Sequence, residues 1–136
     1  MDLHLQDKVV VVTGAGSRTG YGRAIALAFA GEGCHLVLAD VDREGIESLV
    51  EEIEALGRKA LAVRADVTDR EQVASAVSAA LERLGRIDVL VNNAGASSLL
   101  RPFAEMNRAD WDLDIQVNLY GQMNMAQAVL PHMMSR

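Results

Sequence analysis

Apolar and polar positions alternate between two periods along the chain. Lys8–Thr13 (KVVVVT) is a short β-branched run that is apolar on both faces, which predicts a buried parallel strand. His35–Asp40, Lys59–Arg64 and Ile87–Asn92 are runs of the same kind, the third weaker than the others. The pattern therefore predicts four strands at intervals of roughly 25 residues.

Helical spacing fills the intervals between these runs. Arg23–Ala30 is rich in helix formers and is followed by glycines. Ile46–Leu56 and Val73–Leu84 repeat apolar residues at helical spacing, and Gly57 and Gly85 should end them.

Capping and breaker residues set the other boundaries. Thr68 to Glu71 has the form of a capping box, which predicts Thr68 as the N-cap of the third helix. Residues 96–106 are typical of a loop. We expect one long helix from Asn107 to Met134, bent near its end by Pro131.

Strands that alternate with helices are typical of βαβ units and a parallel sheet. Right-handed crossovers then give a Rossmann-like, doubly wound α/β fold. No linker or repeat divides the chain, so residues 1–136 are expected to form one domain.

Charge and composition narrow the function classes. Acidic residues outnumber basic ones 19 to 13, and no Lys/Arg cluster forms a stripe, which argues against nucleic-acid binding. The apolar runs are too short for a membrane span, and residues 1–4 do not resemble a secretory signal. We therefore expect a cytoplasmic protein. The one cysteine and three scattered histidines show no ligand spacing, so no metal site is expected.

A glycine cluster between the first strand and first helix carries the first chemical signal. Glycines there let the backbone approach a pyrophosphate, whose charge the helix N-terminus favours. The alternative is a glycine-rich turn that binds nothing. The candidate cofactor contacts in this cluster are Gly14, Gly16, Ser17, Arg18, Gly20, Tyr21 and Gly22.

Asp40 ends the second strand about 20 residues after the cluster. A carboxylate there can accept both hydroxyls of an adenosine ribose and repels a 2′-phosphate, which favours NAD over NADP. Arg18 is a counter-signal, because a basic side chain in the glycine loop could reach a 2′-phosphate. The alternative for Asp40 is a solvated strand-end residue.

Four motifs together resemble the N-terminal half of the short-chain dehydrogenase/reductase family, over Leu5 to Arg136. They are the glycine cluster, Asp66-Val67 after the third strand, Asn92-Asn93-Ala94-Gly95 after the fourth, and Asn118 in the final helix.

The resemblance implies a role for each motif. Asp66 and Val67 would hold the adenine ring, and the small Ala94 and Gly95 would let cofactor lie against the strand end. Asn93 could tie neighbouring strands or bind the ribose. Asn118, a poor helix former within a helix, would support a proton-relay water and so belong to the catalytic site. The alternatives are ordinary polar turns and an asparagine that satisfies its own helix.

Two departures from the family pattern stand out. Five residues separate Gly14 from Gly20, two more than the usual Thr-Gly-x-x-x-Gly-x-Gly, a spacing that resembles the divergent enoyl-reductase branch. The family's Tyr-x-x-x-Lys pair is also absent, since Tyr120 is followed four residues later by Asn124. We therefore expect a truncated Rossmann domain that lacks the C-terminal catalytic half.

These features predict an NAD-dependent oxidoreductase that transfers hydride between a nicotinamide and a small alcohol or carbonyl substrate. The 136 residues alone are expected to bind nucleotide at most. The alternatives are a non-catalytic dinucleotide- or partner-binding half-domain and a fragment that binds nothing. Within Ser97–Phe103, Leu99, Leu100 and Phe103 suggest an apolar substrate wall and Arg101 an anion contact, although a surface loop fits as well.

The fourth strand should be an exposed edge beside a final helix that the family uses as a subunit interface. We therefore expect a homo-oligomer. The apolar residues of that helix are Leu119, Met123, Met125, Val129 and Met133.

Overall fold

The computed structural model describes residues 1–97 and 102–136. Its strands are β1 (Val9–Thr13), β2 (His35–Asp40), β3 (Ala60–Arg64) and β4 (Val89–Val91). They form one sheet in the order β3-β2-β1-β4, and each neighbouring pair is parallel. The predicted α/β, Rossmann-like fold is confirmed.

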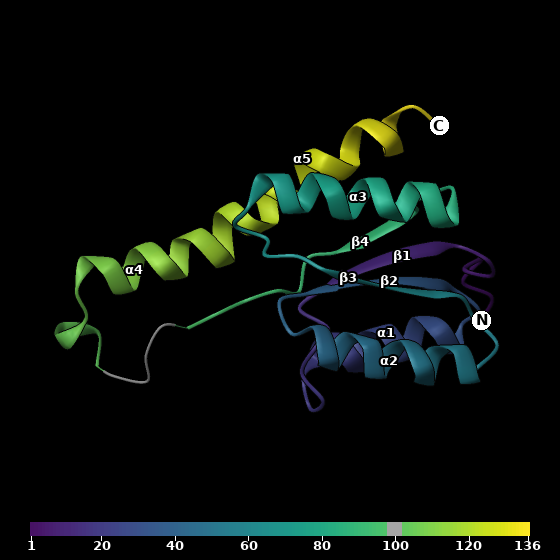
Figure 1. Ribbon diagram of the computed structural model, residues 1–136, viewed down its shortest axis with the longest axis horizontal. Coiled ribbons are helices and arrows are strands. Elements are labelled where there is room, and N and C mark those ends of the chain that lie inside the picture. Colours follow the sequence, from purple (N-terminus) through teal and green to yellow (C-terminus); the bar gives the residue numbers. More distant parts are fainter. Residues whose placement is uncertain (98–101) are drawn as a thin grey trace.

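Helices cover both faces of the sheet (Figure 1). On one side α1 (Tyr21–Gly31) and α2 (Arg43–Ala55) pack on Val10 and Val12, and on the other α3 (Arg70–Leu84) and α5 (Gly121–Met134) pack on Val9 and Val11. Successive β1 side chains enter opposite cores because strand side chains alternate between faces. Burial of each such side chain contributes about 1.5–3 kcal/mol.

Glycines end the helices as predicted. Gly85 caps α3 with φ +79°, and Gly57 follows α2 with φ +77°. Two other boundaries differ from the prediction. Helix α1 begins at Tyr21, so the end of the glycine cluster already belongs to its first turn, and β4 is limited to three residues.

The predicted N-cap of α3 is wrong by one residue. Asp69 is the N-cap, and its carboxylate accepts hydrogen bonds from the N–H groups of Glu71 and Gln72. Thr68 instead donates its hydroxyl to Asp66 at 2.8 Å. A carboxylate at the cap accepts two orphan N–H groups and complements the helix dipole, which a threonine hydroxyl does less well.

The final helix is not one regular helix. A π-helical turn, Gln116–Tyr120, separates α4 (Arg108–Ile115) from α5. Asn107 and Asp110 form a reciprocal capping box at the start of α4, and Pro131 lies inside α5. The apolar residues predicted for this helix differ in burial, because Met125 is fully buried whereas Met123 is 56% exposed.

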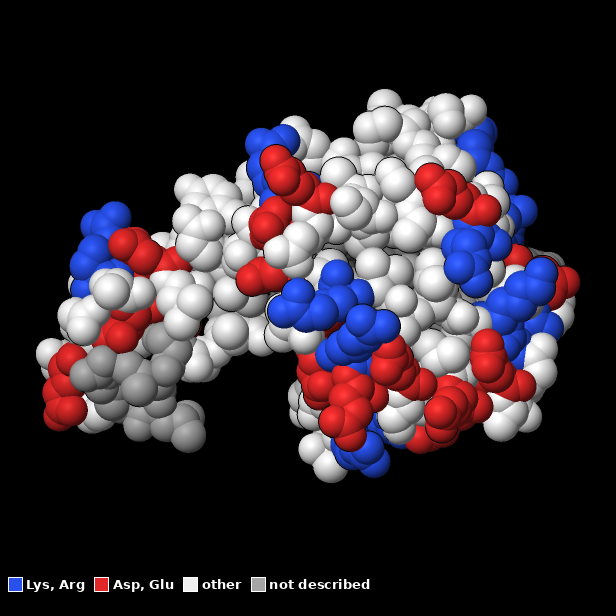
Figure 2. Space-filling view, viewed as in Figure 1, with Lys and Arg blue, Asp and Glu red and all other residues white. Residues whose placement is uncertain are grey.

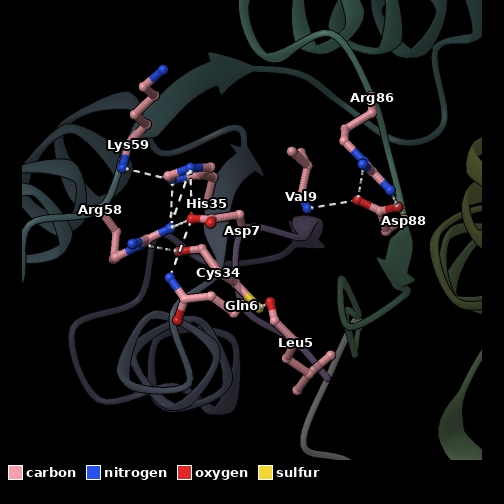
Figure 3. A network of polar contacts seen from close by, with 10 residues as sticks. All are labelled: Leu5, Gln6, Asp7, Val9, Cys34, His35, Arg58, Lys59, Arg86 and Asp88. Atoms are coloured by element: carbon pink, nitrogen blue, oxygen red, sulfur yellow. Dashed lines mark hydrogen bonds and ion pairs between the residues drawn. The ribbon is translucent and has the colours of Figure 1, made fainter. Parts of the chain in front are cut away.

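Polar contacts join the amino edge of the sheet (Figure 3). The Arg58 guanidinium pairs with Asp7 and donates to the carbonyl of Cys34, while the His35 Nδ1 accepts the Lys59 N–H at 3.1 Å. Burial, followed by the charge of Arg58, lowers the pKa of His35. Arg58 thus ties the start of β2 to the N-terminal segment.

Basic and acidic side chains are interspersed on the face drawn in Figure 2. Among the described residues, no helix is both long and apolar enough to cross a membrane. Within the same ranges, no three His, Cys, Asp or Glu residues gather as a metal ligand set.

Candidate functional site

A pocket of about 250 Å³ opens at the carboxyl edge of the sheet. All four strand ends contribute to it, as expected for ligand sites in open α/β sheets. Six of the predicted site residues line this pocket: Gly14, Asp40, Asp66, Val67, Ala94 and Gly95.

Gly14 lines the pocket and packs tightly against Gly22, Asn93 and Ala94. Gly14 has φ +69°, and a Cβ there would lie 2.7 Å from the Ala94 Cα. A Cβ on Gly22 would lie 2.3 Å from the Gly14 carbonyl oxygen. The Asn93 side-chain amide donates to the carbonyls of Thr13 and Gly14 at 2.9 and 3.0 Å. Asn93 therefore ties β4 to β1, one of the two roles predicted for it.

Asp40 fixes the glycine loop from the end of β2. Its Oδ2 accepts the Gly16 N–H at 2.8 Å, and its Oδ1 accepts the Asp42 N–H at 2.9 Å. Helix α2 also approaches this loop closely, because a Cβ on Gly45 would lie 2.0 Å from the Gly16 carbonyl oxygen. Asp40 is thus held at the pocket wall by two backbone donors.

The remaining loop residues lie outside the pocket lining. Ser17 and Arg18 are exposed, and the Arg18 guanidinium lies 4.0 Å from Glu44. Tyr21 is 86% exposed. Gly20 is the N-cap of α1 and offers no side-chain cap, so the first N–H groups of that helix have no side-chain acceptor from it.

Asp66 and Val67 form the wall at the end of β3. The Asp66 Oδ1 accepts the N–H and the hydroxyl of Thr68, and its own N–H donates to Gln72. The Val67 carbonyl accepts the Asn124 side-chain amide at 2.9 Å. No acceptor within the described ranges takes the Val67 N–H, so a backbone donor is open beside the pocket.

Asn118 lies in the π turn and does more than satisfy its own helix. Its Oδ1 accepts the Ala96 N–H at 3.1 Å, and its Nδ2 donates to the Ala96 carbonyl at 2.6 Å. A Cβ on Gly95 would meet the same Oδ1 at 3.0 Å. Asn118 therefore anchors the loop that follows β4. Single π turns within α-helices are frequent at functional sites.

Several pocket residues carried no sequence signal. They are small or apolar residues at or beside strand ends or in the π turn. Nothing in their own residue types indicates a binding site, although each lies within a few residues of a predicted site residue. These are Ala39, Val41, Ala65, Ala96 and Val117.

The predicted substrate wall is only partly described. Leu99, Leu100 and Arg101 lie outside the described residues. Phe103 is 72% exposed and stacks on Trp111, with ring centroids 5.4 Å apart. Phe103 thus contacts α4 rather than the pocket at the strand ends.

Known proteins resemble the chain over nearly its whole length. It is 42% identical over 136 residues to the 3-oxoacyl-[acyl-carrier-protein] reductase FabG of Thermotoga maritima, covering 98% of this chain and 53% of that protein. It is 43% identical to the oxidoreductase UcpA of Salmonella typhimurium, covering 97% and 49%. The chain therefore spans about half the length of the curated relatives it matches.

Solved structures agree. A short chain dehydrogenase/reductase from Burkholderia phymatum, in complex with NAD, has a TM-score of 0.87 at 38% identity, covering 96% of this chain and 46% of that one. An NAD⁺-bound xylitol dehydrogenase has a TM-score of 0.90 at 32% identity, covering 96% and 50%. The family described as short chain dehydrogenase matches residues 8–136. The fold, the glycine cradle and these similarities establish that the chain belongs to the short-chain dehydrogenase family.

Proposed function

We propose that this chain binds NAD at the carboxyl edge of its sheet and supplies the dinucleotide-binding half of an oxidoreductase. The observation that carries the proposal is the cradle around Gly14 and Gly22, where an added Cβ would lie 2.7 and 2.3 Å from backbone atoms. Only glycines let the end of β1 pack this closely against the start of α1, which brings the α1 N-terminus, a favourable site for a pyrophosphate, to the end of the strand. Two relatives of known structure are described as NAD-bound.

The pocket chemistry fits an adenosine next to that cradle. The open Val67 N–H can donate to an adenine ring nitrogen, and the Asp66 carboxylate can accept the adenine amino group. Gly20 is the N-cap of α1 and Gly22 lies in its first turn, where backbone N–H groups and the helix dipole favour phosphate, while the Gly16 N–H holds the loop to Asp40. Ser17, Arg18 and Tyr21 would contact the phosphates from the exposed side.

We infer NAD rather than NADP from the Asp40 carboxylate. It lines the pocket and is held there by the Gly16 and Asp42 N–H groups. A ribose can donate its hydroxyls to this carboxylate, whereas a 2′-phosphate would be repelled. Arg18 would oppose that preference, but Glu44 lies 4.0 Å from its guanidinium.

A bound nicotinamide would supply the hydride chemistry, and this chain would supply position. Ala94 and Gly95 leave room at the β4 end, and Asn118 holds the following loop through Ala96. By family resemblance Asn118 also belongs to the proton relay toward an alcohol or carbonyl substrate. The chain has no Tyr-x-x-x-Lys pair, so we assign binding to these residues and expect turnover only from a protein that supplies the pair.

Calorimetric titration of the 136-residue chain tests the proposal. NAD should bind, and NADP should bind at least tenfold more weakly. Nicotinamide mononucleotide, which lacks the adenosine, should bind more weakly than AMP. Absence of NAD binding by a folded chain, or equal affinity for NAD and NADP, would contradict the proposal.

We also propose self-association through the final helix. This segment comprises α4, the π turn and α5, and many of its apolar side chains are exposed to solvent. Helix α4 extends away from the sheet in Figure 1. The exposed ones are Leu113, Ile115, Leu119, Tyr120, Met123, Leu130 and Met134. So many exposed large apolar side chains on one helical segment are typical of an interaction site. Sedimentation velocity should give a dimer or larger species, and Leu119→Glu with Met123→Glu should shift it to monomer.

A further inference from the structure

We propose that Asn124 is the positioning residue for the adenine subsite, acting through the backbone of Val67. This inference rests on the proposed function, because it concerns how the same pocket holds its nucleotide. Asn124 lies 57 residues beyond Val67 in the sequence and on a different element, α5. Its side-chain amide donates to the Val67 carbonyl at 2.9 Å in a partly buried position.

The segment around Val67 has no regular structure of its own. It lies between the end of β3 at Arg64 and the start of α3 at Arg70, where a single turn is closed by the Asp69 N–H, which donates to the Asp66 carbonyl at 3.0 Å, and side chains supply the other contacts. Gln72 accepts the Asp66 N–H at 3.1 Å, and Asp66 accepts both donors of Thr68. These contacts hold the residues on either side of Val67. Only Asn124 among the described side chains holds the Val67 peptide carbonyl.

Helix α5 also sets the distance of Val67 from the pocket. Gly121 is buried against Val67, and a Cβ there would lie 2.5 Å from the Val67 Cγ2. Gly121 and Asn124 are three residues apart, on one helix face. The glycine therefore admits the valine side chain while the asparagine holds its carbonyl.

The consequence concerns the other side of Val67. With its side chain packed and its carbonyl bonded, Val67 lines the pocket and keeps its N–H open. A donor that is already oriented costs less to use on binding than one that must be ordered. Asn124 does not line the pocket, so its effect on a nucleotide passes through Val67.

Binding of AMP and of nicotinamide mononucleotide to single variants tests this inference. Asn124→Asp keeps the shape but sets an oxygen against the Val67 carbonyl, and Asn124→Leu removes the donor. Each should weaken AMP about five- to tenfold and leave nicotinamide mononucleotide within twofold. Gln127→Leu is the matched control, because Gln127 lies one turn further along α5 and bonds Arg70 instead. It should leave both ligands unchanged.

Two further measurements keep the test decisive if a variant does not fold. In the unaltered chain, the Val67 N–H and the Asn124 side-chain amide NMR resonances should both move as AMP saturates. Asn124→Gln, which retains the donor, should recover part of the AMP affinity. AMP affinity that stays within twofold in folded Asn124 variants, or an unmoved Asn124 amide, overturns the inference while the proposed function stands. Failure of the unaltered chain to bind AMP and NAD overturns both.

Discussion

The Thr13 hydroxyl accepts the Asn93 N–H at 3.1 Å and so joins the end of β1 to the residues that follow β4. It also accepts the Ala94 N–H at 3.0 Å and donates to the Val91 carbonyl. Thr13 is 1% exposed, so its hydroxyl is shielded from water. One buried hydroxyl therefore organises the strand end against which cofactor would lie.

Thr13→Val should lower the free energy of unfolding by about 1–3 kcal/mol. The isosteric change leaves the Ala94 N–H without an acceptor, whereas the Asn93 N–H keeps the Val91 carbonyl at 3.1 Å. Urea denaturation measures the loss. Thr13→Ser retains the hydroxyl and should cost less than Thr13→Val. Equal stability of Thr13→Val and the unaltered chain would show that the hydroxyl is not needed.

Gly14→Ala should lower the free energy of unfolding by more than the unfavourable backbone angle alone would. A side chain at φ near +70° costs about 1–2 kcal/mol anywhere. Gly57 supplies the matched control, because it has φ +77° and nothing within 4 Å of an added Cβ. Gly14→Ala should exceed Gly57→Ala by at least about 1 kcal/mol in urea denaturation, from contact with Ala94. Equal losses would argue that the cradle is not tight.

Asp40→Asn should weaken NAD about tenfold and reduce the preference over NADP. The change removes the charge that accepts ribose hydroxyls, and a hydrogen bond to a charged group contributes about 1.5–3 kcal/mol. Titration calorimetry with both dinucleotides measures the ratio. Glu47→Gln removes a charge on exposed α2 and should not alter the ratio. An unchanged ratio in Asp40→Asn would point to Arg18 as the deciding residue.

Stability should fall as the pH drops below about 6.5, the ordinary pKa of histidine. Burial and Arg58 lower the pKa of His35 in the folded chain, so the unfolded chain binds more protons in this range. The contribution is present above pH 6.5 and is lost toward the lower, folded pKa. The matching variant is His35→Gln, whose amide oxygen can still accept the Lys59 N–H.

Urea denaturation at pH 7.5 and pH 5.0 isolates this effect. The unaltered chain should lose more stability between these values than His35→Gln. The carboxylate of Asp7, whose pKa Arg58 lowers, loses its contribution only at more acidic pH. Identical pH dependence in both proteins would exclude His35 as the cause.

The strands and the glycine-ended helices were predictable because each has a local signal. Val9–Thr13 is β-branched throughout, and Gly57 and Gly85 occupy left-handed positions that favour glycine. The position of Asp40 in the pocket wall was predictable because it is the last residue of a strand. These features need no knowledge of distant residues.

Other parts depend on contacts that the local pattern does not contain. Thr68 and Asp69 are both good caps, and the competing bond from Thr68 to Asp66 selects Asp69. The π turn has no periodic signature in five residues. The sequence gives no role to Asn124 beyond the fact that Tyr120 is not followed by a lysine four residues later, because the partner of Asn124 lies 57 positions earlier.

The length of the π turn determines which way the side chains of α5 face. Successive residues of an α-helix advance by about 100° around the axis, and a π turn accommodates more residues than an α turn. Loss of one residue from Gln116–Tyr120 would therefore rotate the whole of α5 relative to α4. Asn118, within the turn, bonds the Ala96 backbone, and Asn124, after the turn, bonds the Val67 carbonyl. Both asparagines can therefore reach their backbone partners only at the present length of the turn.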